Sequence, residues 1–418
     1  LAPVNPNERI LTLDVLRGIA LFGELAANIW VWFSGIVFRF PEYHAEIWSF
    51  SPDALAYLFI WFFISGKAIT TFSMLFGLGF AVQMMRAQAR GRSIVRPHAR
   101  RLAILLLFGA VHGVFLWYGD ILAAYALLGF ALLLFRKRRE RTLLIWAGVL
   151  IVALPILLSS VPLVIASASP EAGPDPAAQL AEMADRNGEL LALFASADPA
   201  QIVRGNLSML QLQWLSPKSL FLVTLFGIFL LGLYAGRRRL FEHPDAHRAL
   251  LRRLVIYGFP IGMAGTAVGM MLGSIPREEA MALAWMPLAV TTAFTAGTVP
   301  FALAYIATAT LLLERPAWRR PLSAFAPVGR MALTNYLAQT VICISIYYWG
   351  GLVGRAGPLF GLILALVIFP VQMAASAWWL ARFRFGPMEW LWRSLTYGRL
   401  QSMRLAAPAP PAAEPSAG

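Results

Sequence analysis

Long apolar runs follow one another along nearly the whole chain, at about 11–33, 54–85, 102–118, 120–135, 142–168, 208–235, 250–273, 282–313, 327–349 and 357–381. A helix that crosses a bilayer needs about 20 apolar residues. Backbone polar groups inside lipid must be satisfied within the protein, so these runs are expected to be helical. They predict an all-α polytopic membrane protein of about ten transmembrane helices.

The composition supports this class and excludes others. Of the 418 residues, 59% are hydrophobic and 13% are charged, whereas an ordinary soluble domain is about 25% charged. A soluble enzyme and a disordered chain are therefore both disfavoured. We expect one transmembrane helical domain over 1–405 and an Ala/Pro-rich, disordered tail over 406–418. No Cys/His cluster has the spacing of metal ligands, so no metal site and no resident cofactor are predicted.

Basic residues are concentrated in alternate loops. The net charge is +14, and the alternate segments together hold 27 of the 35 basic residues: Arg9, 86–101, 136–141, 237–253, 314–330 and 382–404. Such an excess can indicate nucleic-acid binding, but its alternation follows the positive-inside rule, which favours arginines in cytoplasmic loops. We therefore predict that both termini are cytoplasmic and that nucleic acid is not a partner.

Three local features refine this topology. Residues 169–206 form the one sizeable polar insertion, expected on the outer side as one or two short helices. Residues 385–397 have Gly386-Pro387 near their start, contain Trp390 and Trp392, and predict a helix at the inner interface. The run 54–85 is long enough to need a break, which Ser65-Gly66-Lys67 would supply, and Pro287 and Pro300 are expected to bend the run 282–313.

Ionisable and amide side chains in the first span share one face. Asp14, Arg17, Glu24 and Asn28 lie within about 80° of one another on a helical wheel of 100° per residue. Because such groups are costly in lipid, this stripe is expected to face protein or water and to contribute to a substrate site. Asp14 and Arg17 also suit an i,i+3 ion pair, and Glu24 is expected either to be protonated or to pair with another helix through Lys67.

Histidines provide the candidate bases. His112 lies in the third span, and Asp120 follows in a tight hairpin, so the carboxylate could hold the imidazole as a general base. The alternative is a histidine hydrogen-bonded to a neighbouring helix. His44, in the outer loop after the first span, is a second candidate. His98 lies in an arginine-rich inner loop and is expected to be solvated.

Two amides lie in the ninth span. Asn335 and Gln339 are four residues apart and share a face, where they could contact a ligand or join helices by hydrogen bonds. Arg330, just before them, is a candidate for binding phosphate.

Several motifs carry a family resemblance, namely residues 12–18 (TLDVLRG), 112–125, 329–337, 383–387 and 389–393. They resemble the YeiB family of bacterial inner-membrane proteins, which carry the domain of unknown function numbered 418. The resemblance implies about ten transmembrane helices and a multi-pass protein of the bacterial inner membrane. It brings no established reaction.

A more distant similarity links the chain to the transmembrane acyltransferases, which include heparan-alpha-glucosaminide N-acetyltransferase. The similar pattern is Asp14-Val15-x-Arg17-Gly18, then Asn28, His44-Ala45, Trp48 and Asp53. In that family a histidine of the corresponding outer loop is catalytic, and the acyl donor is a cytoplasmic acyl-CoA. The resemblance therefore implies a catalytic role for His44, while the residues themselves favour His112, and both stay candidates.

These features lead to two hypotheses. In the first, the protein is a membrane-embedded acyltransferase: acyl-CoA enters as co-substrate from the arginine-rich face, and a lipid or glycan acceptor approaches from the outside. His112 or His44 would act as base, Asp120 would orient it, and Asn335 or Gln339 would donate to an oxyanion. In the second, it is a transporter or lipid-handling protein with a polar pathway through the bilayer. A homodimer is left open.

Overall fold

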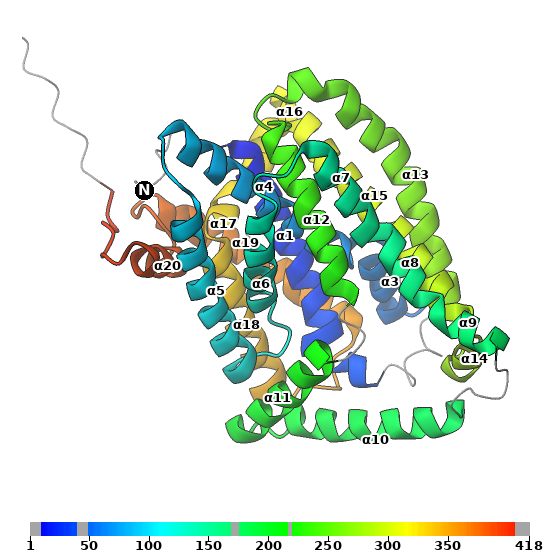
Figure 1. Ribbon diagram of the computed structural model, residues 1–418. Helices are drawn as coiled ribbons and strands as arrows, with labels where there is room; N and C mark the ends of the chain where they lie inside the picture. The colour runs from blue at the N-terminus through cyan, green and yellow to red at the C-terminus, as the bar shows by residue number, and fades with distance from the viewer. Residues whose placement is uncertain (1–9, 40–48, 169–174, 216–219, 406–418) are drawn as a thin grey trace, which may run out of the picture.

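The computed structural model describes residues 10–39, 49–168, 175–215 and 220–405, and the tail predicted to be disordered lies outside them. The described chain is helical, apart from one isolated bridge between Phe383 and Arg404. The predicted all-α class is confirmed (Figure 1).

The helices vary in length from short turns to long spans. In order they are α1 (Leu11–Asn28), η2 (Ile29–Phe33), η3 (Ile36–Phe38), α3 (Pro52–Phe59), η4 (Ile60–Ile64), α4 (Lys67–Ala89), α5 (Val95–Phe115), α6 (Leu122–Leu134), α7 (Glu140–Gly148), η5 (Val149–Ala153), α8 (Leu154–Ser159), α9 (Val161–Ala168), α10 (Pro176–Ala195), α11 (Pro199–Leu215), α12 (Leu220–Arg237), η7 (Pro244–His247), α13 (Arg248–Gly273), α14 (Arg277–Ala282), α15 (Met286–Leu313), α16 (Pro316–Ser323), α17 (Ala326–Arg330), α18 (Ala332–Ile344), η8 (Ser345–Trp349), α19 (Pro358–Leu380) and α20 (Pro387–Tyr397).

Seven helical segments in the described part of the chain are long and apolar enough to cross a membrane: Leu11–Phe33, Pro52–Ala89, Val95–Phe115, Glu140–Ala168, Pro244–Gly273, Met286–Leu313 and Pro358–Leu380. The apolar helices Leu122–Leu134 and Phe221–Arg237 are shorter. The chain is thus a multi-pass membrane protein. The run 327–349 forms α17, α18 and η8, so it is helical as expected. It is not among the segments that are both long and apolar enough to cross a membrane.

The structure divides the apolar run predicted at 208–235. Residues 199–215 belong to α11, which packs on α5 and α10, and a separate helix, α12, follows. Asn206 connects α11 to a distant part of the chain: its amide nitrogen donates to the Val114 carbonyl at 3.1 Å, and its oxygen accepts the Tyr118 N–H at 3.1 Å. These bonds anchor α11 to the α5–α6 hairpin.

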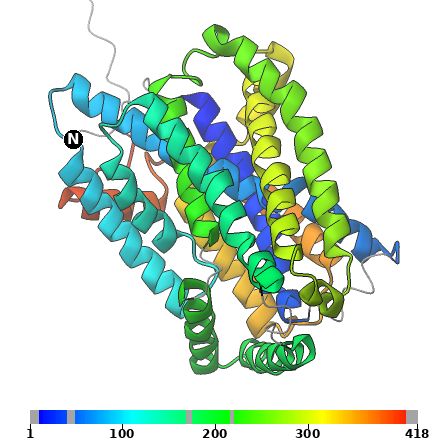
Figure 2. The same cartoon turned by 45° about the vertical axis from the view of Figure 1, so that its right-hand side comes forward.

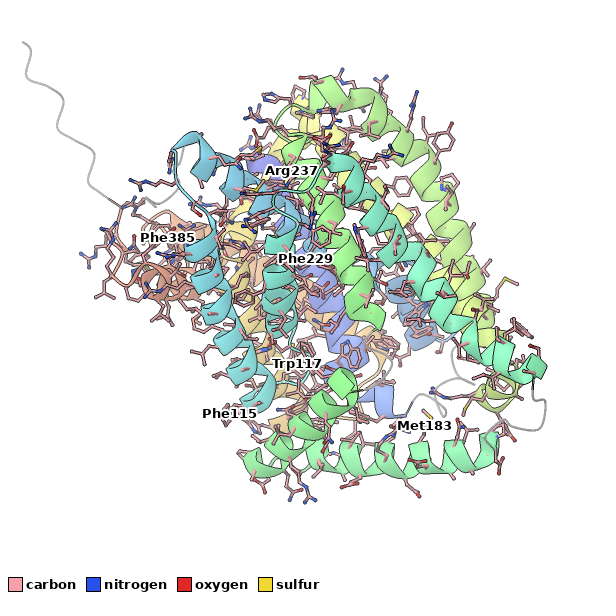
Figure 3. All side chains as sticks on the ribbon, in the orientation of Figure 1. Phe115, Trp117, Met183, Phe229, Arg237 and Phe385 are labelled. Carbon is pink, nitrogen blue, oxygen red and sulfur yellow. The ribbon has the colours of Figure 1, made fainter. Side chains whose placement is uncertain are left out.

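The polar insertion, described from residue 175 onward, and the basic loops lie at opposite ends of the bundle. Figures 1 and 2 both show α10 and α11 across one end, with α16 and the turn before α13 at the other. Figure 3 likewise separates Met183 of α10 from Arg237 of α12. The insertion contains two helices, and α10 continues through Gly188. This separation agrees with the alternation of basic loops.

The expected break in the second run is confirmed. Gly66 adopts φ +78° between η4 and α4, a left-handed conformation that glycine tolerates at little cost. Helix α15 is continuous, with Pro287 in its first turn and Pro300 inside it, and the bend at these prolines stays a prediction.

Helix α1 is the centre of the bundle. It packs against α4, α15, α17, α18 and α19. Its approach to α17 is very close, because a Cβ on Gly18 would overlap the Phe325 carbonyl and a Cβ on Gly329 would overlap the Asp14 carbonyl. Small residues permit such backbone contacts between membrane helices. The α1–α17 contact brings Asp14, Arg17 and Arg330 to one place.

Gly329→Ala is therefore expected to destabilise the protein by about 1–3 kcal/mol, since the methyl group must displace backbone. Thermal unfolding in detergent measures this effect. Gly148→Ala is the matched control: a Cβ there meets no atom within 4 Å, and the substitution should leave stability unchanged or raise it slightly. Equal unfolding temperatures for Gly329→Ala and wild type would contradict the close contact.

Candidate functional site

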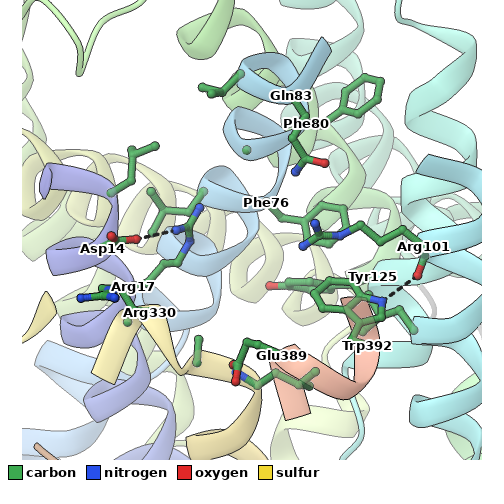
Figure 4. Close-up of a pocket in the computed structure, with 18 of the residues that line it drawn as sticks. Asp14, Arg17, Phe76, Phe80, Gln83, Arg101, Tyr125, Arg330, Glu389 and Trp392 are labelled. Atoms are coloured by element: carbon green, nitrogen blue, oxygen red, sulfur yellow. Dashed lines mark hydrogen bonds and ion pairs between the residues drawn. The ribbon is translucent and has the colours of Figure 1, made fainter. Parts of the chain in front are cut away.

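A cavity of about 380 Å³ lies among α1, α4, α5, α6, α17, α18 and α20. Figure 4 shows Asp14, Arg17 and Arg330 on one side of it and Arg101 with Trp392 on the other. Helices α1 and α5 thus lie on two sides of one space. The cavity is the candidate functional site because charged and apolar side chains converge there.

Arginine outnumbers acidic residues in the cavity wall. Among the described residues, seven arginines and three acids line it, namely Arg17, Arg86, Arg90, Arg101, Arg330, Arg384 and Arg393 against Asp14, Glu24 and Glu389. Arg17 Nη1 lies 3.0 Å from Asp14 Oδ1, which confirms the predicted i,i+3 pair. The excess of positive charge favours an anionic ligand.

Helix α20 closes one wall of the cavity and is held at two points. The Trp392 indole donates to the Arg101 carbonyl at 2.9 Å, and the Arg101 guanidinium lies 3.8 Å from the centre of a Trp392 ring. Glu389 accepts hydrogen bonds from the N–H groups of Leu333 and Thr334 and from the Thr334 hydroxyl, at 2.7, 3.1 and 2.6 Å. The carboxylate therefore caps the N-terminus of α18. The predicted helix at 385–397 is confirmed and begins at Pro387.

Two effects on the pKa of the Glu389 carboxyl oppose each other. Burial raises the pKa of its carboxyl above the ordinary value, while the hydrogen bonds from Thr334 and Leu333 lower it. A capped carboxylate at this position fixes α20 to α18.

The rest of the cavity is largely apolar. Leu75, Phe72, Phe76 and Leu105 line it, together with Tyr125, whose hydroxyl lies 2.6 Å from Ser73 Oγ. The cavity therefore joins an arginine-rich part to an apolar part. This arrangement suits an amphiphile that carries an anionic head.

Glu24 is the acid in this apolar part. It lines the cavity, and its Oε1 atom is buried with no hydrogen-bond partner in the described structure. The expected pairing with Lys67 does not occur among the described residues. The Lys67 ammonium instead donates to the Trp61 carbonyl at 3.2 Å and lies 5.5 Å from the Phe301 ring centre.

His98 is buried, whereas the sequence predicts a solvated side chain. It belongs to α5, is only 4% exposed and lines the cavity. Neither ring nitrogen has a hydrogen-bond partner in the described chain, and the ring lies 4.7 Å from that of Phe80. The helix begins seven residues before the apolar run that predicts it. The i,i+3 spacing to Arg101 could have placed both side chains on one face.

His112 and Asp120 form the predicted contact. Asp120 Oδ1 lies 2.9 Å from His112 Nδ1, and its Oδ2 accepts the Ala123 N–H at 2.8 Å, at the start of α6. Because a carboxylate only accepts, Nδ1 carries a proton and donates it. His112 Nε2 lies 3.0 Å from the Thr340 hydroxyl. The imidazole is therefore bonded on both sides and 2% exposed.

This pair lies beside the cavity rather than in its wall. His112 and Asp120 do not line it, but Tyr336 does, and the Tyr336 and His112 ring centres are 5.2 Å apart. Asn28 also lies outside the lining. Of Glu24, Asn28, His112 and Asp120, only Glu24 lines the cavity.

The two amides of α18 join helices. Asn335 Nδ2 donates to the Met331 carbonyl at 3.0 Å and to Ser376 Oγ at 2.9 Å, while Gln339 Nε2 donates to Gln372 Oε1 at 2.8 Å. Neither lines the cavity. Of the two readings of these amides, the structure displays helix packing between α18 and α19.

Two candidate positions from the sequence remain, His44 and Asp53. His44 lies outside the described residues. Asp53, part of the acyltransferase-like pattern, accepts the Leu359 N–H at 2.8 Å and caps the start of α19.

Comparison with known proteins identifies the family but no activity. The chain is 36% identical to the uncharacterized protein YxaH of Bacillus subtilis, over 95% of this chain and 96% of that protein. The chain belongs to the DUF418 family. The model of this family, described as a protein of unknown function, matches residues 235–399.

Two further relatives of this DUF418 protein span nearly its whole length. Uncharacterized protein YeiB of Escherichia coli is 32% identical over 96% of this chain and 98% of its own. An uncharacterized 39.9 kDa protein in the amylase 3' region of Bacillus acidopullulyticus is 29% identical over 95% of this chain. No solved structure matches the chain. The predicted family is therefore confirmed.

His112→Ala tests the buried pair. The variant leaves Asp120 Oδ1 without its partner, which is expected to cost about 1–3 kcal/mol of unfolding free energy, whereas the Thr340 hydroxyl keeps its hydrogen bond to the Tyr336 carbonyl at 3.4 Å. Thermal unfolding followed by tryptophan fluorescence measures this. His243→Ala, at an exposed histidine, is the control and should unfold like the wild type. An unchanged unfolding temperature for His112→Ala would show that the network does not stabilise the fold.

Proposed function

We propose that this DUF418 protein is an acyltransferase of the bacterial inner membrane. Its cavity receives an acyl thioester, acyl-CoA as co-substrate, from the cytoplasmic side, and the acyl group passes to a lipid or glycan acceptor at the outer side or outer leaflet. One observation carries the proposal: a single cavity joins a group of arginines to an apolar interior that contains isolated polar side chains.

The arginines match the phosphates of such a donor. Seven guanidinium groups surround the cavity, and arginine binds phosphate oxygens through two parallel hydrogen bonds. The low-dielectric walls strengthen this attraction relative to water. Arg101 is also oriented by Trp392, so that its guanidinium is positioned before a ligand binds.

The depth of the cavity matches the extended arm of acyl-CoA, which is the chain between its phosphates and its thioester. Arg17 and Glu24 are seven residues apart on α1, which corresponds to about 10 Å along the helix. A head bound at Arg17 and Arg101 would direct its arm toward Glu24, between Phe72 and Tyr125. The thioester would then lie within the apolar part, where water is scarce.

The His112–Asp120 pair is the candidate base in this proposal. Asp120 fixes the Nδ1–H tautomer, so that Nε2 can accept a proton from the acceptor hydroxyl or amine. The acceptor attacks the thioester carbonyl, the carbon–sulfur bond breaks, and the thiolate leaves and takes up a proton. Nε2 must exchange its Thr340 contact for the acceptor, and the Tyr336 ring must move aside. His44 is the alternative base.

A second candidate function rests on the broken helix at Ser65-Gly66. Discontinuous helices near the middle of the membrane are typical of transporters, and Lys67 directly follows the break. The break does not line the cavity, however. A transporter would use the Lys67 region as its pathway, whereas the acyltransferase uses the arginine-lined cavity.

The proposal requires a defined orientation. Arg139 lies in a basic loop and Asp185 lies in α10, and both are exposed. We expect a membrane-impermeant maleimide to label Asp185→Cys on intact spheroplasts and to label Arg139→Cys only after lysis, in a background where the buried Cys343 is replaced. Labelling of Arg139→Cys in intact spheroplasts would reverse the orientation.

The donor is tested directly with purified protein. We expect release of free thiol from acetyl-CoA, slow in detergent and faster with acceptor-containing membrane extract. Arg101→Gln should raise KM about tenfold, as expected for a lost charge-assisted contact of about 1.4 kcal/mol. Arg252→Gln, at an exposed arginine outside the cavity, is the control. Absence of thiol release by the wild type, together with flux of solutes into proteoliposomes, would favour a transporter.

A further inference from the structure

Glu24 is an acid in a cavity wall formed largely by apolar residues. Its Oε1 atom is buried and has no hydrogen-bond partner among the described residues. An unpaired buried acceptor costs about 1–3 kcal/mol. A ligand that donates a hydrogen bond to this oxygen would recover that cost on binding.

The surroundings of Glu24 indicate a neutral donor on the ligand's arm. Tyr125 and Tyr336 share the cavity wall with Glu24. Lys67 is engaged with Trp61 and Phe301. The nearest arginine on the same helix, Arg17, is paired with Asp14 about two turns away. The carboxyl is therefore separated from the cationic part of the cavity that would hold the head.

We infer that Glu24 selects ligands whose arm carries an amide N–H at its depth, and that the preferred ligand is a phosphopantetheine thioester rather than a diacyl phospholipid. This inference rests on the proposed function. Both ligand classes offer phosphate to the arginines and an apolar portion to the interior. Only the pantetheine arm places amide N–H groups between the phosphate and the reacting end. Glu24 is thus a specificity residue rather than a catalytic one.

The physical basis is the difference between the two arms in an apolar wall. An acyl chain would cover Oε1 with methylene groups and leave it unsatisfied, whereas an amide would donate to it. Sites that hydrogen-bond a ligand group reject analogues that lack it, because the buried partner is then left unpaired. Glu24 therefore favours the amide-bearing arm and disfavours lipid tails from the surrounding bilayer.

The experiment compares two probes on three variants of the full chain. The probes are coenzyme A and phosphatidic acid, which share phosphate and differ in the amide-bearing arm, and their affinities are measured by native mass spectrometry. Glu24→Leu removes the acceptor and roughly keeps the volume, Glu24→Gln keeps an acceptor oxygen, and Glu278→Leu is the control at an exposed acid far from the cavity lining.

We expect Glu24→Leu to weaken coenzyme A binding about ten- to one-hundredfold and to leave phosphatidic acid binding unchanged or tighter. Glu24→Gln should weaken coenzyme A binding less than Glu24→Leu does, and Glu278→Leu should leave it unchanged. Equal loss for both probes, or no loss for either, would overturn the inference while leaving the donor class standing. If the wild type binds phosphatidic acid but not coenzyme A, the proposed function itself fails. Both Glu24 variants remove a buried acid, so they are expected to fold.

Discussion

Charged side chains on membrane-spanning helices must avoid lipid, and this constraint organises the interior of the protein. A charge at the bilayer centre costs at least about 2.5–3.5 kcal/mol. Helix α1 carries Asp14, Arg17 and Glu24 on one stripe, and all three line the cavity. Beside this stripe α1 is buried against its neighbours, and Gly18 allows α17 to approach closely. The polar stripe thereby forms a wall of the cavity.

The cationic part of the cavity depends on segments that are distant in the sequence. Arg101 of α5 and Trp392 of α20 hold each other, and Glu389 fastens α20 to the N-terminus of α18. Helix α20 is short and amphipathic, and these contacts hold it against the bundle. The same contacts bring Arg393 and Arg384 to the cavity, so the anchoring of α20 and the concentration of positive charge have one cause.

The buried His112–Asp120–Thr340 network and the cavity are neighbouring but separate polar regions. Tyr336 contacts the imidazole and also lines the cavity. Glu24 and His98 line the cavity and have buried polar atoms without hydrogen-bond partners in the described structure, whereas the His112 network is satisfied within the protein.

Patterns within single helices were readable from the sequence: the helical class, the break at Gly66, the Asp14–Arg17 pair and the His112–Asp120 contact across a short hairpin. Each depends on spacing along one helix or one tight turn. Only the tertiary structure decided that His98 is buried in the cavity, that Lys67 does not pair with Glu24, and that Asn335 and Gln339 join α18 to α19. Those outcomes depend on which helices pack together, and apolar runs of similar composition do not specify their neighbours.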